Sequence, residues 1–286
     1  MTLIVILIGM AIEHFIGVAD EIRRLSWFNA YAGWLERQFS RQVYWDGPLG
    51  VIITLAVPLL ALLLLQWIIY AVFPPAVMLF ALAVLLYCLG PRYLNPQLEE
   101  YIDAVQVSDF TRAEHLARGF GVTEEEPPQT RQAVMEGILL AANQRLFGVL
   151  FWFIVLGPFG ALLYRLNCVM WLRQYEIHGA YSDAVRHLYN ILNWPVARLL
   201  AFSYALTGNM VRAVEAWRET ESKLFSVNEA VMLATGLASL DHLSPEEEIT
   251  EEEFLDALHS LRGLLNRALL LWLSVLGIMT LSGWLG

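Results

Sequence analysis

The sequence is poor in charge and almost without lysine. Only 16% of its 286 residues are charged, and Lys223 is the single lysine beside a set of arginines. The formal net charge is −10, which argues against a basic face, so no nucleic-acid partner is predicted. The only two cysteines, Cys88 and Cys168, lie within or at the end of apolar runs, which excludes a disulfide framework and a cysteine metal site.

Motifs of familiar soluble enzymes are also missing. The one lysine follows Ser222, so the sequence has no phosphate-binding P-loop. No histidine pair has the H-E-x-x-H spacing of a zinc protease, no G-x-S-x-G segment occurs, and no G-x-G-x-x-G segment follows a strand. We therefore assign no metal ligands and no firm cofactor.

Apolar residues are abundant and lie in long runs. They make up 57% of the chain, and the mean hydropathy is +0.52, whereas a soluble domain is about 45–50% apolar. This composition predicts an all-α membrane protein. The expected architecture is a polytopic helical bundle of four to five transmembrane or re-entrant helices with cytoplasmic helical segments.

Four apolar segments mark the expected membrane part, since a spanning helix needs about 20 apolar residues. No Asp, Glu, Lys or Arg occurs between Asp46 and Arg92, and a Phe-Pro-Pro turn at 73–75 divides this run. It predicts a helical hairpin. The expected segments are a first helix at 1–19, the hairpin at 51–90, a membrane or re-entrant helix at 146–164 and a last helix at 265–286. Polar helical regions are expected at 92–145 and 166–264.

The distribution of arginine favours a re-entrant segment at 146–164, which a Gly-Pro-Phe-Gly break interrupts at 157–160. If this segment crosses fully, the positive residues divide evenly between the two sides. If it turns back, all of them share one side, as the preference of Lys and Arg for the cytoplasm requires. We expect a multi-pass protein of the bacterial inner membrane with both ends in the periplasm. A kinked full crossing is the alternative.

A re-entrant segment would bring two polar clusters to one membrane face, the residues 143–145 before it and 164–167 at its end. Two guanidiniums there would suit a phosphate or carboxylate, although both could instead reach lipid phosphates. A third cluster, Asn193-Trp194-Pro195, fits a helix start that is capped by Asn193 and directs Arg198 toward an anion. The candidate ligand-binding residues are Asn143, Arg145, Tyr164, Arg165, Asn167, Asn193 and Arg198.

Glu13 and His14 are ionisable residues inside the first apolar helix. Such groups are costly in a bilayer and usually face a bundle interior or a water-filled cavity. They would suit a small transporter if they faced a central path. A position in the headgroup layer is the equal alternative.

The order of the short motifs resembles the AmpE family of Gram-negative inner-membrane proteins. The resemblance rests on Phe151-Trp152 before the Gly-Pro break, Tyr164-Arg165 after it, Asn193-Trp194-Pro195 with Arg198-Leu199, and the segment Tyr204–Gly208 with Ala216-Trp217. It implies a signalling protein of β-lactamase regulation and cell-wall recycling. It also implies the cytoplasmic amidase AmpD as a partner. Membrane lipid is a further expected partner, and a homodimer is left open.

The AmpE family is distantly similar to the CbiB/CobD cobinamide-phosphate synthases, membrane enzymes that form an amide bond using ATP. The synthases typically carry an acidic pair where this chain has Tyr189 and Asn190, and an Asp near the position of Arg145. Because carboxylates hold Mg²⁺ in phosphoryl chemistry, these differences favour a non-enzymatic sensor of an anionic ligand. The alternative is an ATP- and Mg²⁺-dependent synthase in which the nearest acid, Asp183, is catalytic.

Overall fold

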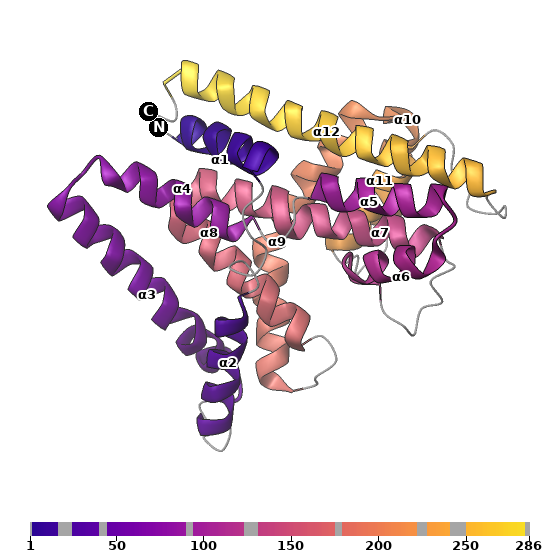
Figure 1. Ribbon diagram of the computed structural model, residues 1–286. Coiled ribbons are helices and arrows are strands. Elements are labelled where there is room, and N and C mark those ends of the chain that lie inside the picture. Colours follow the sequence, from indigo (N-terminus) through magenta and orange to yellow (C-terminus); the bar gives the residue numbers. More distant parts are fainter. Residues whose placement is uncertain are drawn as a thin grey trace. The chain divides into compact units, whose positions relative to one another are not determined.

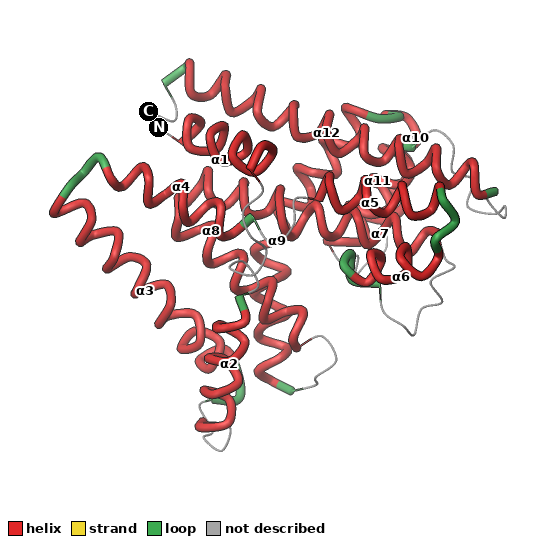
Figure 2. The backbone as a smooth tube through the Cα atoms, in the orientation of Figure 1, coloured by secondary structure: helices red, strands yellow, loops and turns green. Residues whose placement is uncertain are grey.

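The computed structural model describes residues 2–16, 25–39, 45–89, 94–122, 131–174, 179–221, 228–240 and 250–283. Every regular element in these ranges is helical, which confirms the all-α class (Figure 2). The chain divides into two compact units. Unit 1 consists of Met1–Pro91, Gln144–Asn193 and Leu285–Gly286, and unit 2 of Arg92–Asn143 and Trp194–Trp284.

Three helical stretches among the described residues are long and apolar enough to cross a membrane. They are Pro48–Val72, Arg131–Gln174 and Glu251–Leu281, with mean hydropathies of 2.6, 2.3 and 1.8 over their most apolar windows. Two further helices, Leu3–Ile12 and Ala76–Cys88, are apolar but shorter. The predicted membrane character is thus present in both units.

Unit 1 contains the predicted hairpin. Helix α3 (Pro48–Val72) begins with a proline, which needs no hydrogen-bond partner for its nitrogen at a helix start, and it contains Pro58 in its interior. Helix α4 (Ala76–Cys88) follows the turn at Pro74-Pro75. The two helices diverge from this turn (Figure 1). Helices α1 (Thr2–Ile16) and α2 (Ser26–Phe39) precede them.

Helix α8 (Gly148–Gln174) reverses direction at Gly157, whose φ of 64° and ψ of −151° are not helical. A Cβ on Gly148 would clash with the ring of Tyr164, and one on Gly160 would clash with the backbone of Trp152. In a straight helix residues 148 and 164 would be about 24 Å apart. The two arms of α8 are therefore folded back on each other, which is the geometry that the re-entrant interpretation needs.

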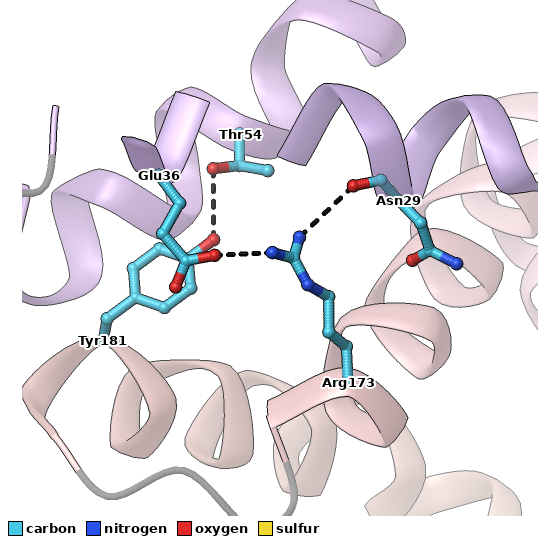
Figure 3. A network of polar contacts seen from close by, with 5 residues as sticks. All are labelled: Asn29, Glu36, Thr54, Arg173 and Tyr181. Atoms are coloured by element: carbon cyan, nitrogen blue, oxygen red, sulfur yellow. Dashed lines mark hydrogen bonds and ion pairs between the residues drawn. The ribbon is translucent and has the colours of Figure 1, made fainter. Parts of the chain in front are cut away.

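A polar network joins α2 and α3 to α8 and α9 (Ala180–Thr207) within unit 1 (Figure 3). Arg173 Nη2 lies 2.6 Å from Glu36 Oε2, and Arg173 Nη1 donates to the carbonyl of Asn29 at 3.4 Å. The Tyr181 hydroxyl lies 3.2 Å from Thr54 Oγ1. Burial raises the pKa of Tyr181, so this phenol stays protonated at neutral pH. These contacts fix the helices that surround the folded-back segment.

Unit 2 is a set of helices, and two of the turns between them are short and capped by a side chain. Asp109 caps α6, because its side chain accepts from the Arg112 amide at 3.1 Å. A break at Gly208-Asn209 separates α9 from α10, and Asn209 accepts from the Arg212 amide at 3.3 Å. The helices of this unit are α5 (Leu94–Gln106), α6 (Phe110–Arg118), α7 (Arg131–Ala142), the second half of α9, α10 (Met210–Glu221), α11 (Asn228–Ala238) and α12 (Glu251–Leu281).

Two expectations about helix ends are wrong. Pro195 does not start a helix, because α9 continues through it from Ala180 to Thr207. A proline removes one backbone hydrogen bond from a helix, and the buried residues on both sides of Pro195 hold the helix together in spite of that loss. The last apolar segment is also not a separate helix. Helix α12 begins at Glu251 with a Thr250 capping box and runs without a break through residue 265.

Candidate functional site

The two arms of α8 bring positive charge together in unit 1. Arg145 lies in the π-helical segment η1 (Asn143–Phe147) before the first arm, and Arg165 lies in the second arm. The two guanidiniums are close enough to interact electrostatically. Arg145 is half-buried, and Arg165 is only 7% exposed. The predicted convergence of these two residues is therefore present in the structure.

Arg165 has an unusual environment for a buried cation. Its Nε atom is buried without a hydrogen-bond partner, and among the described residues no carboxylate forms an ion pair with it. Its electrostatic neighbours in α4 are Tyr87 and Cys88. Burying a charge is costly unless it is paired. An anion from outside the chain would remove this cost.

Asn167 is the second buried polar group that the fold leaves unsatisfied. Its side chain is fully buried, and neither its amide nitrogen nor its amide oxygen has a hydrogen-bond partner among the described residues. Asn167 is three residues after Tyr164, so both lie on the same face of the second arm. Buried polar groups without partners are rare in native proteins and usually indicate a ligand, an ion or a water.

Helix α9 holds the folded-back segment through three hydrogen bonds within unit 1. The Tyr164 hydroxyl donates to Asn193 Oδ1 at 3.3 Å, and both side chains are buried. Trp152 Nε1 donates to the Leu192 carbonyl at 3.0 Å. Gln144 Nε2 donates to the hydroxyl of Tyr189 at 3.0 Å. The prediction that Asn193 caps a helix is therefore wrong. Asn193 lies inside α9, where it positions Tyr164.

Sequence reasoning missed Gln144, Trp152 and Tyr189 as parts of this site. Tyr189 precedes Asn193 by four residues on one helix, so the two share a face, and this spacing was the available signal. Tyr189 also stacks on Trp171, with ring centroids 5.2 Å apart. The contact between Gln144 and Tyr189 has no local signal in the sequence, because a sequence distance of 45 residues separates them.

The remaining predicted residues lie elsewhere. Asn143 is buried at the start of η1 and belongs to unit 2. Arg198 also belongs to unit 2, where it donates to Asn228 Oδ1 at 2.8 Å and lies 4.7 Å from the Trp194 ring centroid. Asp183 lies in the first turn of α9, where its exposed carboxylate is 3.8 Å from Arg186. The side chains of Glu13 and His14 lie outside the described residues.

The profile of the CobD/Cbib protein family matches residues 6–242. The chain belongs to the CobD/CbiB family. Two curated relatives carry the name cobalamin biosynthesis protein CobD. The one from Stutzerimonas stutzeri (strain A1501) is 31% identical over 190 residues, 63% of this chain and 61% of the relative. The one from Chromobacterium violaceum is 30% identical over 165 residues, 55% of this chain and 53% of the relative.

This CobD/CbiB chain thus spans less than two thirds of the length of the curated relatives that it matches. No solved structure matches it. The family match covers parts of both units, including η1, α8 and α9. It therefore includes the residues of the buried polar cluster.

The family assignment corrects three expectations. The resemblance to AmpE is wrong, since the profile and both relatives belong to the CobD/CbiB family. The main functional interpretation, a non-enzymatic sensor of cell-wall or antibiotic stress, is wrong for the same reason. The preference for a non-enzymatic protein is also overturned, because the chain belongs to the CobD/CbiB family and both relatives carry the name cobalamin biosynthesis protein CobD. The expected partnership with AmpD rested on the AmpE resemblance alone.

Proposed function

We propose that the protein is a membrane enzyme of cobalamin biosynthesis that forms an amide bond, as an adenosylcobinamide-phosphate synthase does. The family match over residues 6–242 and the two curated relatives support this function. The chain has Tyr189, Asn190 and Arg145 at positions where synthases typically carry acidic residues. It departs from the typical synthase pattern there, but it still belongs to the family.

The buried cluster in unit 1 is the observation that carries the proposal. The product of this activity carries a phosphate, and a guanidinium is the side chain best suited to hold phosphate oxygens. Arg165, with which no carboxylate of the described residues forms an ion pair, would bind these oxygens, and the nearby Arg145 would add a second positive charge. Asn167 would donate or accept a hydrogen bond on the face that it shares with Tyr164.

The surrounding residues would orient the phosphate and exclude water from it. Asn193 holds the Tyr164 hydroxyl, and Trp152 is fixed to the backbone of α9. Such preorganised donors in a desolvated site bind anions more strongly than they would in water. The cluster is therefore suited to positioning a substrate, which is how proximity accelerates a bond-forming step.

The cluster does not fit a magnesium site. Its polar groups are guanidiniums, amides and phenols, whereas Mg²⁺ is usually held by carboxylates. Across the residues that the structure describes, no group of three His, Cys, Asp or Glu side chains could hold a metal ion.

For the membrane arrangement, we infer that α1, α3, α4 and α12 cross the bilayer of the bacterial inner membrane and that α8 is re-entrant. The reversal at Gly157 supports the re-entrant segment. With this arrangement all lysines and arginines lie on the cytoplasmic side, and both ends of the chain lie in the periplasm.

An amide-formation assay with purified protein and a phosphate-bearing amine substrate tests this function. Arg165→Lys keeps the charge but loses the bidentate fork, so we expect KM for that substrate to rise about tenfold or more. Arg186→Lys changes an arginine that pairs with Asp183 at the surface of the same unit and is the matched control.

The two outcomes that would contradict the proposal are distinct. If the wild-type protein forms no amide in a reaction that a known synthase catalyses, the proposed function is wrong. If the wild type is active and Arg165→Lys has the KM of Arg186→Lys, the function stands and the phosphate site lies elsewhere.

A further inference from the structure

Unit 1 also contains a cavity of about 580 Å³ between α2, α3, α4 and α8. This volume is within the range of small-molecule sites, roughly 300–1,000 Å³. The cavity is separate from the polar cluster in its chemistry, since its walls are almost entirely apolar. They include Tyr31, Pro58, Ala61, Phe80, Ala83 and Leu162.

Two apolar helices, α3 and α4, line much of the cavity. Helix α3 is the most apolar candidate span, and Leu60, Leu63 and Leu64 on its surface are 63%, 42% and 58% exposed. In a bilayer such residues face lipid hydrocarbon. Ala61 and Ala83 leave space where α3 and α4 diverge (Figure 1). An apolar space of this kind is filled at little cost by an acyl chain, whereas water in it would lack hydrogen-bond partners.

Polar groups at α2 give the cavity a defined end. The Tyr31 hydroxyl is buried and has no hydrogen-bond partner among the described residues. Trp27 Nε1 donates to the Tyr87 hydroxyl at 2.5 Å, and all three rings line the cavity. Tyrosine and tryptophan with this amphipathic character favour the level of the lipid headgroups. The Tyr31 hydroxyl can therefore donate to an ester carbonyl at the top of an acyl chain.

We propose that this cavity binds one acyl chain of a glycerophospholipid, with its ester carbonyl at Tyr31. The bound chain packs against Leu162 of α8, three residues before Arg165. Tyr87 lines the cavity and is also an electrostatic neighbour of Arg165. The lipid thus supports the helix that carries the polar cluster. This site does not depend on the proposed function.

Photo-crosslinking in nanodiscs tests the site. The full chain is reconstituted with a phospholipid that carries a diazirine within one acyl chain, irradiated, digested and sequenced by mass spectrometry. In the wild type we expect adducts on Phe80 and Ala83 as well as on the outer surface of α3. Ala83→Trp fills the cavity, so the adducts on Phe80 and Tyr87 are lost while those on Leu63 remain.

Leu63→Trp is the matched control, because it places the same ring on the outer surface of α3 and leaves the cavity open. It is expected to retain the adducts on Phe80 and Ala83. Ala61→Phe fills the cavity from α3 and serves as a second test if Ala83→Trp does not fold. The proposal is overturned if wild-type adducts occur only on outward residues, or if adducts on Phe80 persist in a folded, filled variant.

Discussion

At the scale of single residues, the most informative feature is a buried amide that has no hydrogen-bond partner within the described part of the chain. Asn167 lies in the second arm of α8, and its neighbours Leu166 and Cys168 are fully buried. An apolar residue of similar size would serve packing better, because it would avoid the desolvation of an unpaired polar group. The position therefore favours binding over stability, which is typical of functional sites.

Asn167→Leu tests this trade-off. Because the substitution removes an unsatisfied amide, we expect the free energy of unfolding without ligand to rise by about 1–3 kcal/mol. The same change should abolish the response of stability to phosphate-bearing substrate. Thermal unfolding of purified protein, with and without substrate, measures both effects. Asn190→Leu, at a half-buried position of α9 in the same unit, is the control for a generic Asn replacement.

A lower melting temperature for Asn167→Leu than for the wild type would contradict this interpretation. It would show that the amide already has a stabilising partner in the ligand-free protein.

At the scale of elements, local signals predicted helices well and their tertiary roles less well. The charge-free run with Pro74-Pro75 predicted the α3–α4 hairpin, and Gly157-Pro158 predicted the reversal in α8. The prediction of a helix start at Pro195 was wrong because tertiary packing keeps α9 helical although the proline removes one backbone hydrogen bond. The change from polar to apolar in α12 is no helix boundary, since backbone hydrogen bonding does not depend on which solvent surrounds the side chains.

The candidate site follows the same division. The convergence of Arg145 and Arg165 was predictable, because it follows from one reversal in a short segment. The pairings of Gln144 with Tyr189 and of Trp152 with Leu192 join residues about 40 positions apart and depend on how α9 packs. The family was predicted wrongly because the resemblance depended on the order of short motifs, and none of these motifs contains residues whose chemistry distinguishes AmpE from CobD/CbiB proteins.

Gly157→Ala tests the reversal itself. Gly157 has a positive φ and an extended ψ of −151°, a backbone region that is essentially restricted to glycine and costs other residues about 1–3 kcal/mol. We expect this variant to unfold at a lower temperature and to lose amide-forming activity, because the arms that hold Arg145 and Arg165 would no longer be fixed. Gly277→Ala is the matched control, since a Cβ there meets no atom within 4 Å.

The control is expected to be as stable as the wild type or more stable, because alanine favours a helix over glycine by about 1 kcal/mol. Equal stability and activity of Gly157→Ala and Gly277→Ala would show that the segment tolerates a regular helix at this point, and the re-entrant arrangement would be wrong.

At the scale of the whole molecule, the membrane arrangement turns on whether 131–174 returns to its starting side or crosses. The two alternatives differ in where they place the arginines. A full crossing would place the arginines before α8 and those after it on different sides of the membrane. The re-entrant arrangement places them all on the cytoplasmic side, in keeping with the positive-inside rule. Exposed positions on either side of α8 can separate the two.

Labelling of single cysteines shows on which side of the membrane each position lies. Cys88 and Cys168 are buried, and both are first replaced by alanine. Val107→Cys and His187→Cys, at exposed positions before and after the folded-back segment, are then labelled in intact cells with a maleimide that does not cross membranes. We expect neither to react until the inner membrane is permeabilised. Phe73→Cys, at the exposed tip of the hairpin, should react at once and is the positive control.

The pattern distinguishes the two arrangements without reference to activity. Between these two positions, Arg131–Gln174 is the one described stretch that is long and apolar enough to cross a membrane, so a full crossing would put Val107 and His187 on opposite sides. One would then react in intact cells and the other would not. Shared protection of both positions, together with reaction at Phe73, requires that the segment turn back at Gly157 and deliver Arg145 and Arg165 to the same membrane face.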